Sequence, residues 1–542
     1  MKNWWKGSVI YQIYPRSFLD TTGNGIGDIK GITKNLDYIS KLGVDAIWLS
    51  PVFTSPMNDM GYDVSHYTDI DPLFGSLEDF DEMVKKSHEL NLKVVIDQVL
   101  SHSSDQLPFF KESRTSKDSE KSDWYVWADS KEDGSPPNNW LSVFGGPAWE
   151  WEPLRGQYYL HNFLPSQPDF NFHNVKVQSW LLERSRFWLE RGVDGFRLDT
   201  VNYYFHDKKL RSNPPSSINY KNPPTNPRDL QDQRHAINQT ENLKFLEKYR
   251  SLLDEFQETT SVGEVGDNHR ALEIMNDYTN GNKRLHMAYS FDLLGSRFTA
   301  SHIKNTVEGF FSKSDESWPC WSFSNHDVTR HVSRWNSSAS DNKSFAKLTG
   351  AILMSLRGSV CLYQGEELGQ TETELKFNEL TDPPGIRFWP ANKGRDGCRT
   401  PMTWNSTLNN AGFSESKPWL PVKKRQQENS VNLQIKSKDS VLSFYSNFLI
   451  FRKLNASLVD GSIDFKFIDE RILFYIRIKN NAPIGCIFNL SKEEIILSYR
   501  NIILLKDSPS QKLQTDHDTL KLFGNGFGFF KIKPDFLLQL KN

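Results

Sequence analysis

The feature that most constrains this chain is an alternation of short, continuously apolar segments with amphipathic segments of helical period. Continuously apolar strands indicate burial on both faces, as in parallel strands covered by helices. In chain order these segments are 8–14, 46–49, 93–100, 195–200, 261–265, 288–293, 321–324 and 359–363. Eight βα units close most simply into a (β/α)8 barrel, the α/β TIM-barrel fold.

Two stretches depart from this alternation. Between residues 103 and 171 there is little periodicity and much Trp, Gly and Pro, and so long an excursion indicates an inserted domain rather than a loop. Near the C-terminus, alternating segments such as 471–478 and 484–490 indicate an antiparallel β-sandwich. We therefore expect a barrel of residues 1–102 and 172–455, an inserted domain of 103–171 and a C-terminal β domain of 456–542.

The composition excludes several classes of protein. Lys+Arg 65 and Asp+Glu 67 give a formal net charge of −2, which argues against nucleic acid as the main partner. No apolar run approaches the roughly 20 residues that cross a bilayer, and the first residues lack the apolar stretch of a secretory signal. The four cysteines show no C-x-x-C spacing, so neither a disulfide framework nor a zinc site is indicated. We expect a cytoplasmic enzyme, a monomer or weak homodimer, with no nucleic-acid or membrane partner and no organic cofactor.

Carboxylates stand where several predicted strands end, which is where barrels carry function. Asp199 closes the fourth strand, Glu264 lies in the fifth, and Asp327 follows the seventh. A single such residue could be a salt-bridged part of the barrel, but converging carboxylates raise one another's pKa and are costly without a task. Glycoside hydrolysis is that task, because one carboxylate attacks the anomeric carbon while a protonated one donates to the leaving oxygen.

The motifs around these residues resemble glycoside hydrolase family 13, the α-amylase family, in its α-glucosidase and oligo-1,6-glucosidase branch. The matching segments are 11–18 (YQIYPRSF), 61–63 (GYD), 97–102 (DQVLSH), 195–199 (GFRLD), 262–264 (VGE) and 325–327 (NHD). Two more, 364–369 (QGEELG) and 394–402 (GRDGCRTPM), are similar to exo-acting glucosidases in particular. Several motifs in the order found in the family indicate that family specifically, whereas any single motif would be weak evidence for it.

The resemblance implies a role for each catalytic residue. Asp199 would be the nucleophile, Glu264 the general acid/base, and Asp327 the residue that binds the 2- and 3-hydroxyls and stabilises the transition state. Arg197 lies two residues before Asp199, so both side chains face one side of the strand and Arg197 would keep the nucleophile ionised. Glu264 would instead be held protonated by burial and neighbouring carboxylates.

The resemblance also implies a substrate pocket. His102 and His326 would bond sugar hydroxyls, while Asp59, Tyr62 and Arg399 would close the pocket, with Tyr62 as a stacking platform. We expect most tryptophans of the inserted domain to be core residues and one or two of their rings to face sugar.

Two positions bear on specificity. Ser101 stands where the family often has Asn, a difference found in a bacterial α-glucosidase subgroup. Thr200 follows the nucleophile; relatives that prefer α-1,6 bonds usually carry Val there, and relatives with Ala or Thr tend to prefer α-1,4 bonds. The resemblance thus implies a retaining exo-α-glucosidase acting on short, maltose-like oligosaccharides. An oligo-1,6-glucosidase, or a transglucosylase or isomerase acting on maltose or sucrose, remains the alternative.

Two other classes are disfavoured. A metal-dependent barrel hydrolase needs histidines at ligand spacing, and His102 and His326 stand far apart without such partners. The transporter-associated heavy chains of the family need a membrane-spanning segment, and no apolar run of this sequence is long enough to be one. The catalytic carboxylates are also intact in this chain, which disfavours that class.

Residues 20–28 (DTTGNGIGD) resemble a divalent-cation loop in the first barrel connection. The oxygen ligands would be Asp20, Thr22, Asn24, the carbonyl of Ile26 and Asp28. This set would suit a structural Ca²⁺ or Mg²⁺ away from the chemistry. Only two of the ligands carry charge, so a glycine-rich turn without a metal remains the alternative.

Overall fold

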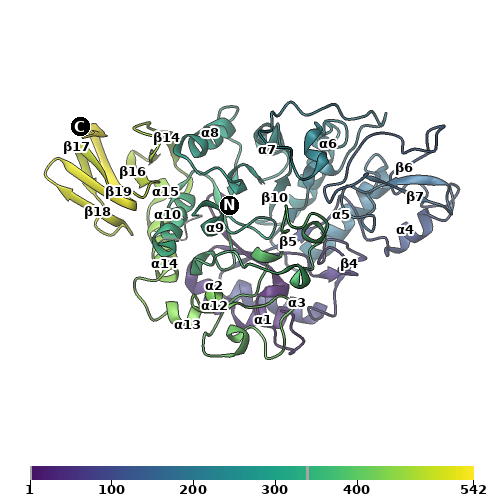
Figure 1. Ribbon diagram of the computed structural model, residues 1–542, viewed down its shortest axis with the longest axis horizontal. Helices are drawn as coiled ribbons and strands as arrows, with labels where there is room; N and C mark the ends of the chain where they lie inside the picture. Colours follow the sequence, from purple (N-terminus) through teal and green to yellow (C-terminus); the bar gives the residue numbers. More distant parts are fainter. Residues whose placement is uncertain (1–2, 337–340, 542) are drawn as a thin grey trace.

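Eight parallel strands form the centre of the molecule, as the computed structural model shows (Figure 1). Their order in the sheet is β11-β10-β9-β5-β2-β1-β13-β12. The bounds are β1 Val9–Ile13, β2 Ala46–Leu49, β5 Lys93–Gln98, β9 Gly195–Leu198, β10 Thr260–Val265, β11 Met287–Ser290, β12 Cys320–Trp321 and β13 Ser359–Tyr363. A single pairing of Ala288 with Pro319 joins the edge strands β11 and β12, so the sheet is the predicted barrel, nearly closed.

The structure describes residues 3–336 and 341–541. The predicted domain ranges also include residues 1, 2, 337–340 and 542, which lie outside the described part of the chain.

Helices pack around the outside of the barrel. The main ones are α1 Ile29–Lys34, α2 Leu36–Leu42, α3 Leu77–Glu89, α5 Val175–Glu190, α6 Asn242–Leu253, α7 Ala271–Thr279, α8 Ala300–Phe311, α9 His331–Trp335, α10 Asn342–Ser355 and α14 Val441–Leu454. Helix α3 illustrates how the sequence sets their ends: the Ser76 hydroxyl accepts from the Asp79 amide, and Asp79 accepts in return from the Ser76 amide. Its apolar face, which includes Phe80 and Met83, is buried in the core shared with the strands.

A small sheet lies between β5 and α5, at one end of the long axis in Figure 1. It consists of β6 Trp127–Ala128, β8 Gln157–Leu160 and β7 Trp149–Glu152 in that order, preceded by helix α4 Pro108–Ser113. Trp140 and Trp149 are buried in its core and stack at 5.9 Å between ring centroids. This segment therefore carries its own apolar core above the carboxyl ends of the barrel strands.

The C-terminal antiparallel sheet lies at the opposite end of the long axis (Figure 1). Its strands are β14 Ser462–Phe465, β15 Ile472–Lys479, β16 Ala482–Asn489, β17 Ile495–Leu504, β18 Gln511–Asp516 and β19 Thr519–Leu540. One face packs on the barrel, where Phe444 of α14 meets Phe527 of β19. Side chains of the other face, including Phe474, Ile487 and Leu520, form a separate core. The long β19 pairs with β16, β17 and β18 and so joins the two layers.

Five strand predictions were too long. The strands predicted at 8–14, 93–100 and 195–200 are Val9–Ile13, Lys93–Gln98 and Gly195–Leu198. The strand predicted at 288–293 ends at Ser290 and is followed by a 3-10 turn, Asp292–Leu294, and the strand predicted at 321–324 is Cys320–Trp321. Leu293 and Phe323 are buried by turns rather than by pairing, and apolar sequence alone does not distinguish the two.

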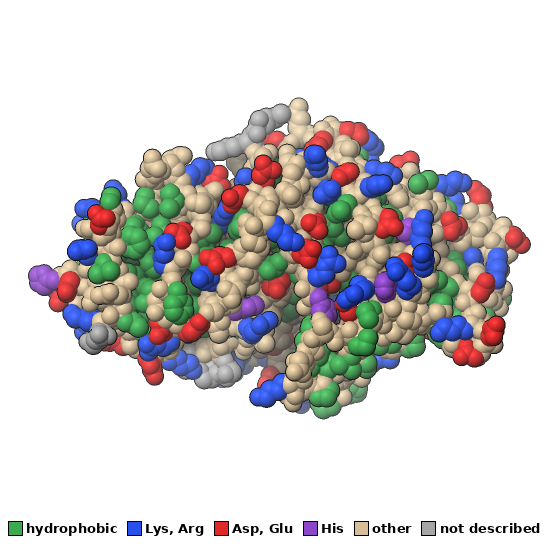
Figure 2. Space-filling model, turned by 90° about the horizontal axis from the view of Figure 1, so that it is seen from above, with side chains coloured by type: hydrophobic (Ala, Val, Ile, Leu, Met, Phe, Trp, Pro, Cys, Tyr) green, Lys and Arg blue, Asp and Glu red, His purple; other side chains and the backbone are tan. Residues whose placement is uncertain are grey.

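Many charged residues lie on the surface (Figure 2), whereas the cysteines lie in the interior. Figure 2 shows acidic and basic side chains interspersed over one face of the molecule. All four cysteines are buried and free. Within residues 3–336 and 341–541, no helix has the length and apolarity needed to cross a bilayer.

Candidate active site

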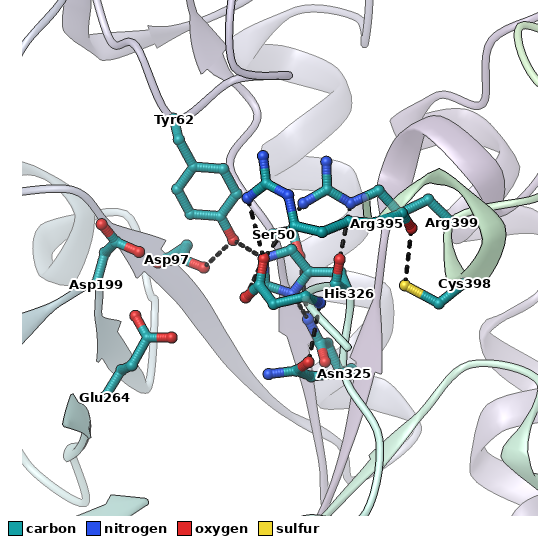
Figure 3. Close-up of polar contacts among 12 residues, drawn as sticks. Ser50, Tyr62, Asp97, Asp199, Glu264, Asn325, His326, Arg395, Cys398 and Arg399 are labelled. Atoms are coloured by element: carbon teal, nitrogen blue, oxygen red, sulfur yellow. Dashed lines mark hydrogen bonds and ion pairs between the residues drawn. The ribbon is translucent and has the colours of Figure 1, made fainter. Parts of the chain in front are cut away.

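A cavity of about 520 Å³ lies at the carboxyl ends of the barrel strands. Eight of the residues predicted from the sequence line it: Asp59, Tyr62, His102, Asp199, Thr200, Glu264, His326 and Asp327. The other two, Arg197 and Arg399, are fully buried and contact the carboxylates from behind. Figure 3 shows Asp199 and Glu264 close together, with Tyr62 and His326 nearby.

The Arg197 guanidinium joins three carboxylates. Its Nη1 lies 2.7 Å from Asp199 Oδ1 and 2.8 Å from Asp97 Oδ1, and its Nη2 lies 2.6 Å from Glu264 Oε2. The strand register pairs Arg197 directly with Asp97, so both side chains point to the same side of the sheet. Asp97 was not among the predicted site residues, although its place in the 97–102 motif was the signal that could have identified it.

One cation is too little charge for three buried carboxylates. Burial raises the pKa of Asp199 and of Glu264 to about 7, and that of Asp97 to about 6, while Arg197 opposes the rise in each. The sequence suggested that Arg197 would keep Asp199 ionised and leave Glu264 protonated. Burial raises the pKa of both, and the one guanidinium that they share with Asp97 does not offset this rise, so the cluster holds a proton near neutral pH.

Asp327 has the opposite environment. Arg395 Nη1 and Arg399 Nη2 each lie 3.2 Å from its Oδ1. Burial would raise its pKa, but the neighbouring cations outweigh burial and hold the pKa well below the ordinary value. Burial also lowers the pKa of His326 to about 3, so this ring is neutral and the arginines supply the positive charge. Asp327 therefore stays ionised in the pH range where Asp199 and Glu264 take up protons.

Asp59 and Arg399, two members of the predicted pocket-closing set, have different partners in the structure. Asp59 pairs with Arg395, Nη2 to Oδ1 at 2.8 Å, while Arg399 donates to the His326 carbonyl and to Asp327. Arg395 also pairs with the buried Asp382 at 2.7 Å. The sequence reasoning missed Arg395, which stands four residues before Arg399 in the 394–402 motif.

Tyr62 belongs to a hydrogen-bonded series (Figure 3). Its hydroxyl donates to Asp97 Oδ2 at 3.1 Å and accepts from His326 Nε2 at 2.6 Å. Gln12 Nε2 lies 2.8 Å from His326 Nδ1 and donates to it. The Tyr62 and His326 rings stack, with centroids 5.3 Å apart and planes at 4°. These contacts fix both rings at the cavity wall.

Thr200 adopts φ 39° and ψ 48°, a left-handed conformation that is unusual for a β-branched residue. Its amide donates to Glu264 Oε2 at 2.9 Å, and its hydroxyl lies near Asp199 Oδ2 and Ser101. Burial lowers the pKa of His102 to about 4, so this ring, which follows Ser101, is neutral. The turn after β9 thus brings groups from three strand ends into contact.

The aromatic rings that the inserted segment contributes to the cavity are Phe144 and Phe163. No tryptophan of residues 103–171 lines the cavity. Trp140 and Trp149 fill its core, and Trp151 points outward with 43% of its surface exposed. Aromatic residues that face the pocket and those that face the core are of the same types, so the sequence alone does not distinguish them.

The carboxylates of the predicted cation loop accept backbone hydrogen bonds. Asp20 accepts from the amides of Thr22, Gly23 and Gly25, and Asp28 accepts from Thr21. A cation at this loop would share these oxygens with the amides or displace them. No group of three or more His, Cys, Asp or Glu in the described ranges is placed to hold a metal ion. The cation at this loop stays a prediction.

Comparison with known proteins identifies the family of this chain. The family model described as "Alpha amylase, catalytic domain" matches residues 12–461. A "Probable alpha-glucosidase" of Rhizobium meliloti (strain 1021) is 54% identical over 497 residues, 91% of this chain and 90% of that protein. An "Oligo-1,6-glucosidase" of Heyndrickxia coagulans is 36% identical over 91% of this chain and 93% of its own.

Solved structures have the same fold. The crystal structure of the "alpha-glucosyl transfer enzyme" XgtA superposes with a TM-score of 0.95 at 48% identity and covers 98% of this chain and 100% of its own. The trehalulose synthase MutB superposes with a TM-score of 0.90 at 31% identity, over 98% and 100% of the two chains. The chain belongs to the α-amylase family of glycoside hydrolases.

Proposed function

We propose that the chain is a retaining, exo-acting α-glucosidase that releases glucose from the non-reducing end of short α-glucosides. The observation that carries the proposal is the sharing of Arg197 by Asp199 and Glu264 at the base of one cavity. Retaining glycosidases hold their carboxyl groups about 5–5.5 Å apart, inverting ones about 6.5–9.5 Å. Two carboxyls bonded to one guanidinium favour the closer spacing.

In this mechanism the raised pKa values have a use. The proton held by the cluster sits on Glu264 in the productive state and passes to the glycosidic oxygen as Asp199 forms a bond to the anomeric carbon. Glu264, now ionised, then removes a proton from the water that hydrolyses the glucosyl ester. Asp327 keeps its negative charge throughout and stabilises positive charge on the sugar ring.

Exo action follows from how the cavity is closed. The Arg395–Asp59 pair joins the loop after β3 (Phe53–Thr54) to the loop after β13 at the cavity wall. Such a closure would leave no passage for a longer chain past the first glucose. We propose a preference for α-1,4 bonds, which is supported by Thr200 at the position after the nucleophile.

A second candidate is supported by one relative. XgtA, which is 48% identical, is described as an α-glucosyl transfer enzyme. A glucosyl ester on Asp199 reacts with a sugar hydroxyl by the same step as with water, so transfer needs no change in the catalytic residues.

The test is product analysis with the purified enzyme on maltose, isomaltose, sucrose and soluble starch, followed by NMR, with Asp199→Asn as the inactive control. Rapid release of α-glucose from maltose, with starch nearly untouched, supports the proposal. Initial release of β-glucose would overturn retention, and a preference for isomaltose would overturn the linkage argument. New oligosaccharides without net glucose would favour the transfer enzyme.

A further inference from the structure

Two hydroxyl groups connect Asp199 with His102 beneath the cavity. Thr200 Oγ1 lies 3.2 Å from Asp199 Oδ2 and 2.9 Å from Ser101 Oγ. Ser101 Oγ lies 2.9 Å from His102 Nδ1. We propose that Ser101 and Thr200 are positioning residues that couple the tautomer of His102 to the charge of Asp199.

Hydrogen counting shows why the two ends are coupled. The ring of His102 is neutral, so one of its nitrogens carries a hydrogen and the other accepts. Ser101 and Thr200 each have one hydroxyl hydrogen to donate. When all three contacts of the series are hydrogen bonds, both hydroxyls therefore donate in the same direction along it.

In the first arrangement the series runs toward the histidine. His102 Nε2–H donates to the Tyr62 carbonyl at 2.9 Å, and Nδ1 accepts from Ser101. Ser101 then accepts from Thr200, whose lone pair faces Asp199 Oδ2. This arrangement suits a neutral Asp199, since a protonated oxygen donates to Thr200 and a charged one is left without a donor.

In the second arrangement every hydrogen bond reverses. His102 Nδ1–H donates to Ser101, Ser101 donates to Thr200, and Thr200 donates to the Asp199 carboxylate. His102 Nε2 now accepts from the amide of Gln167, which lies 3.2 Å away. One proton leaves Nε2 and one arrives at Nδ1, so the charge of the ring is unchanged.

Each ring nitrogen of His102 thus has a partner for either tautomer. Nε2 faces both an obligate acceptor, the Tyr62 carbonyl, and a donor, the Gln167 amide. The Tyr62 end favours hydrogen on Nε2, whereas a charged Asp199 favours hydrogen on Nδ1. The two preferences compete. When Asp199 loses its charge, the hydrogen bonds of the series reverse direction, and His102 Nε2 changes from an acceptor to a donor.

Other charged or titratable groups face Asp199 but do not replace this link. They are Arg197 on its own strand, Asp97 from β5, Glu264 from β10, Asp327 from the loop after β12, and the Tyr62 phenol. Arg197 binds Oδ1, whereas Thr200 binds Oδ2. Asn at position 199 would turn its carbonyl oxygen to Arg197 and its NH₂ to Thr200, and so imitate the neutral carboxyl.

The first test is ¹⁵N NMR of the full-length protein labelled at histidine, with the His102 signals assigned by their loss in His102→Gln. At pH 8 we expect wild type to carry more hydrogen on Nδ1 than Asp199→Asn does. In a Ser101→Ala background, Asp199→Asn should no longer change the tautomer. The same tautomer in wild type and Asp199→Asn, or a change that persists without Ser101, would overturn the proposal. This readout needs no turnover, so it stands apart from the proposed glucosidase function on which the kinetic test rests.

The second test is the acid limb of the pH dependence of kcat/KM, which reports the pKa of the nucleophile in the free enzyme. Thr200→Val removes the donor to Asp199 and should move the limb upward, whereas Ser101→Ala frees the Thr200 hydrogen for Asp199 and should move it downward, each by about one pH unit or less. Thr200→Ser keeps the hydroxyl and should restore the wild-type limb. Shifts in the same direction, or no shift in either variant, would contradict the coupling.

Discussion

Replacing Asp199 by Asn should abolish turnover and also make the protein more stable at pH 8. Burial raises the pKa of Asp199 from 3.8 to about 7. At about 1.4 kcal/mol per pKa unit, holding this group ionised costs the folded state up to about 4 kcal/mol. Asn is neutral and of the same shape, so it removes this cost and leaves Arg197 to the two remaining carboxylates.

The sign of the pH dependence follows from linkage. A carboxyl with a raised pKa binds its proton more tightly in the folded state, so stability falls as pH rises from about 4 to about 7. Asp199→Asn has no ionisable carboxyl at this position, so its stability lacks this decrease with rising pH. The difference in stability between variant and wild type should therefore be small near pH 4 and fully developed by pH 8.

The assay is denaturant unfolding at pH 4.5 and pH 8, together with kcat on maltose. We expect kcat to fall by at least about 10⁴-fold and the unfolding midpoint at pH 8 to rise. Asp69→Asn, an exposed carboxyl on β4 (His66–Ile70), is the matched control and should change neither. A variant no more stable than wild type at pH 8 would refute the linkage argument, and near-normal turnover would refute the role of Asp199.

Three further outcomes are expected. Arg395→Gln leaves Asp59 without its cation and leaves Asp327 and Asp382 with Arg399 alone, so the free energy of unfolding should fall by about 3 kcal/mol and kcat/KM should fall with it. Unchanged values in unfolding and kinetics would count against that ion-pair cluster. Gly263→Ala places a Cβ against the Leu285 side chain and should lower stability by about 1–3 kcal/mol in the same unfolding assay. Chelation with EDTA should leave the thermal midpoint unchanged, because N–H donors already occupy the carboxylate oxygens of loop 20–28; a midpoint raised by added Ca²⁺ would show that the loop rearranges to bind it.

The barrel was predictable because short, largely apolar strands such as β2 and β13 alternate with segments of helical period. Side chains two apart on one strand, such as Arg197 and Asp199, must share a side, so their contact followed from spacing alone. The meeting of Asp199 and Glu264 followed from the common edge at which parallel strands end.

Other features depended on packing that no spacing encodes. Arg395 and Arg399 lie four residues apart in one motif, and only the path of the loop decides that Arg395 pairs with Asp59. The raised pKa of Asp199 has the same origin, because it depends on how deeply the carboxylates are buried and on how many of them share one cation. The cytoplasmic location and the oligomeric state stay predictions.

The pairing of Ala288 with Pro319 gives the barrel a seam. Strand β12 has two residues, and it pairs with β13 at two positions but touches β11 through this one bridge. Pro319 has no amide hydrogen to contribute, so the seam is poor in hydrogen bonds compared with the other strand junctions. Local opening should begin there, and amide hydrogens beside it should exchange with solvent sooner than those of β1 or β2. The segment that follows β12 carries Asp327. Local opening at this seam would therefore displace Asp327, the carboxylate that stays charged, before the other carboxylates of the pocket.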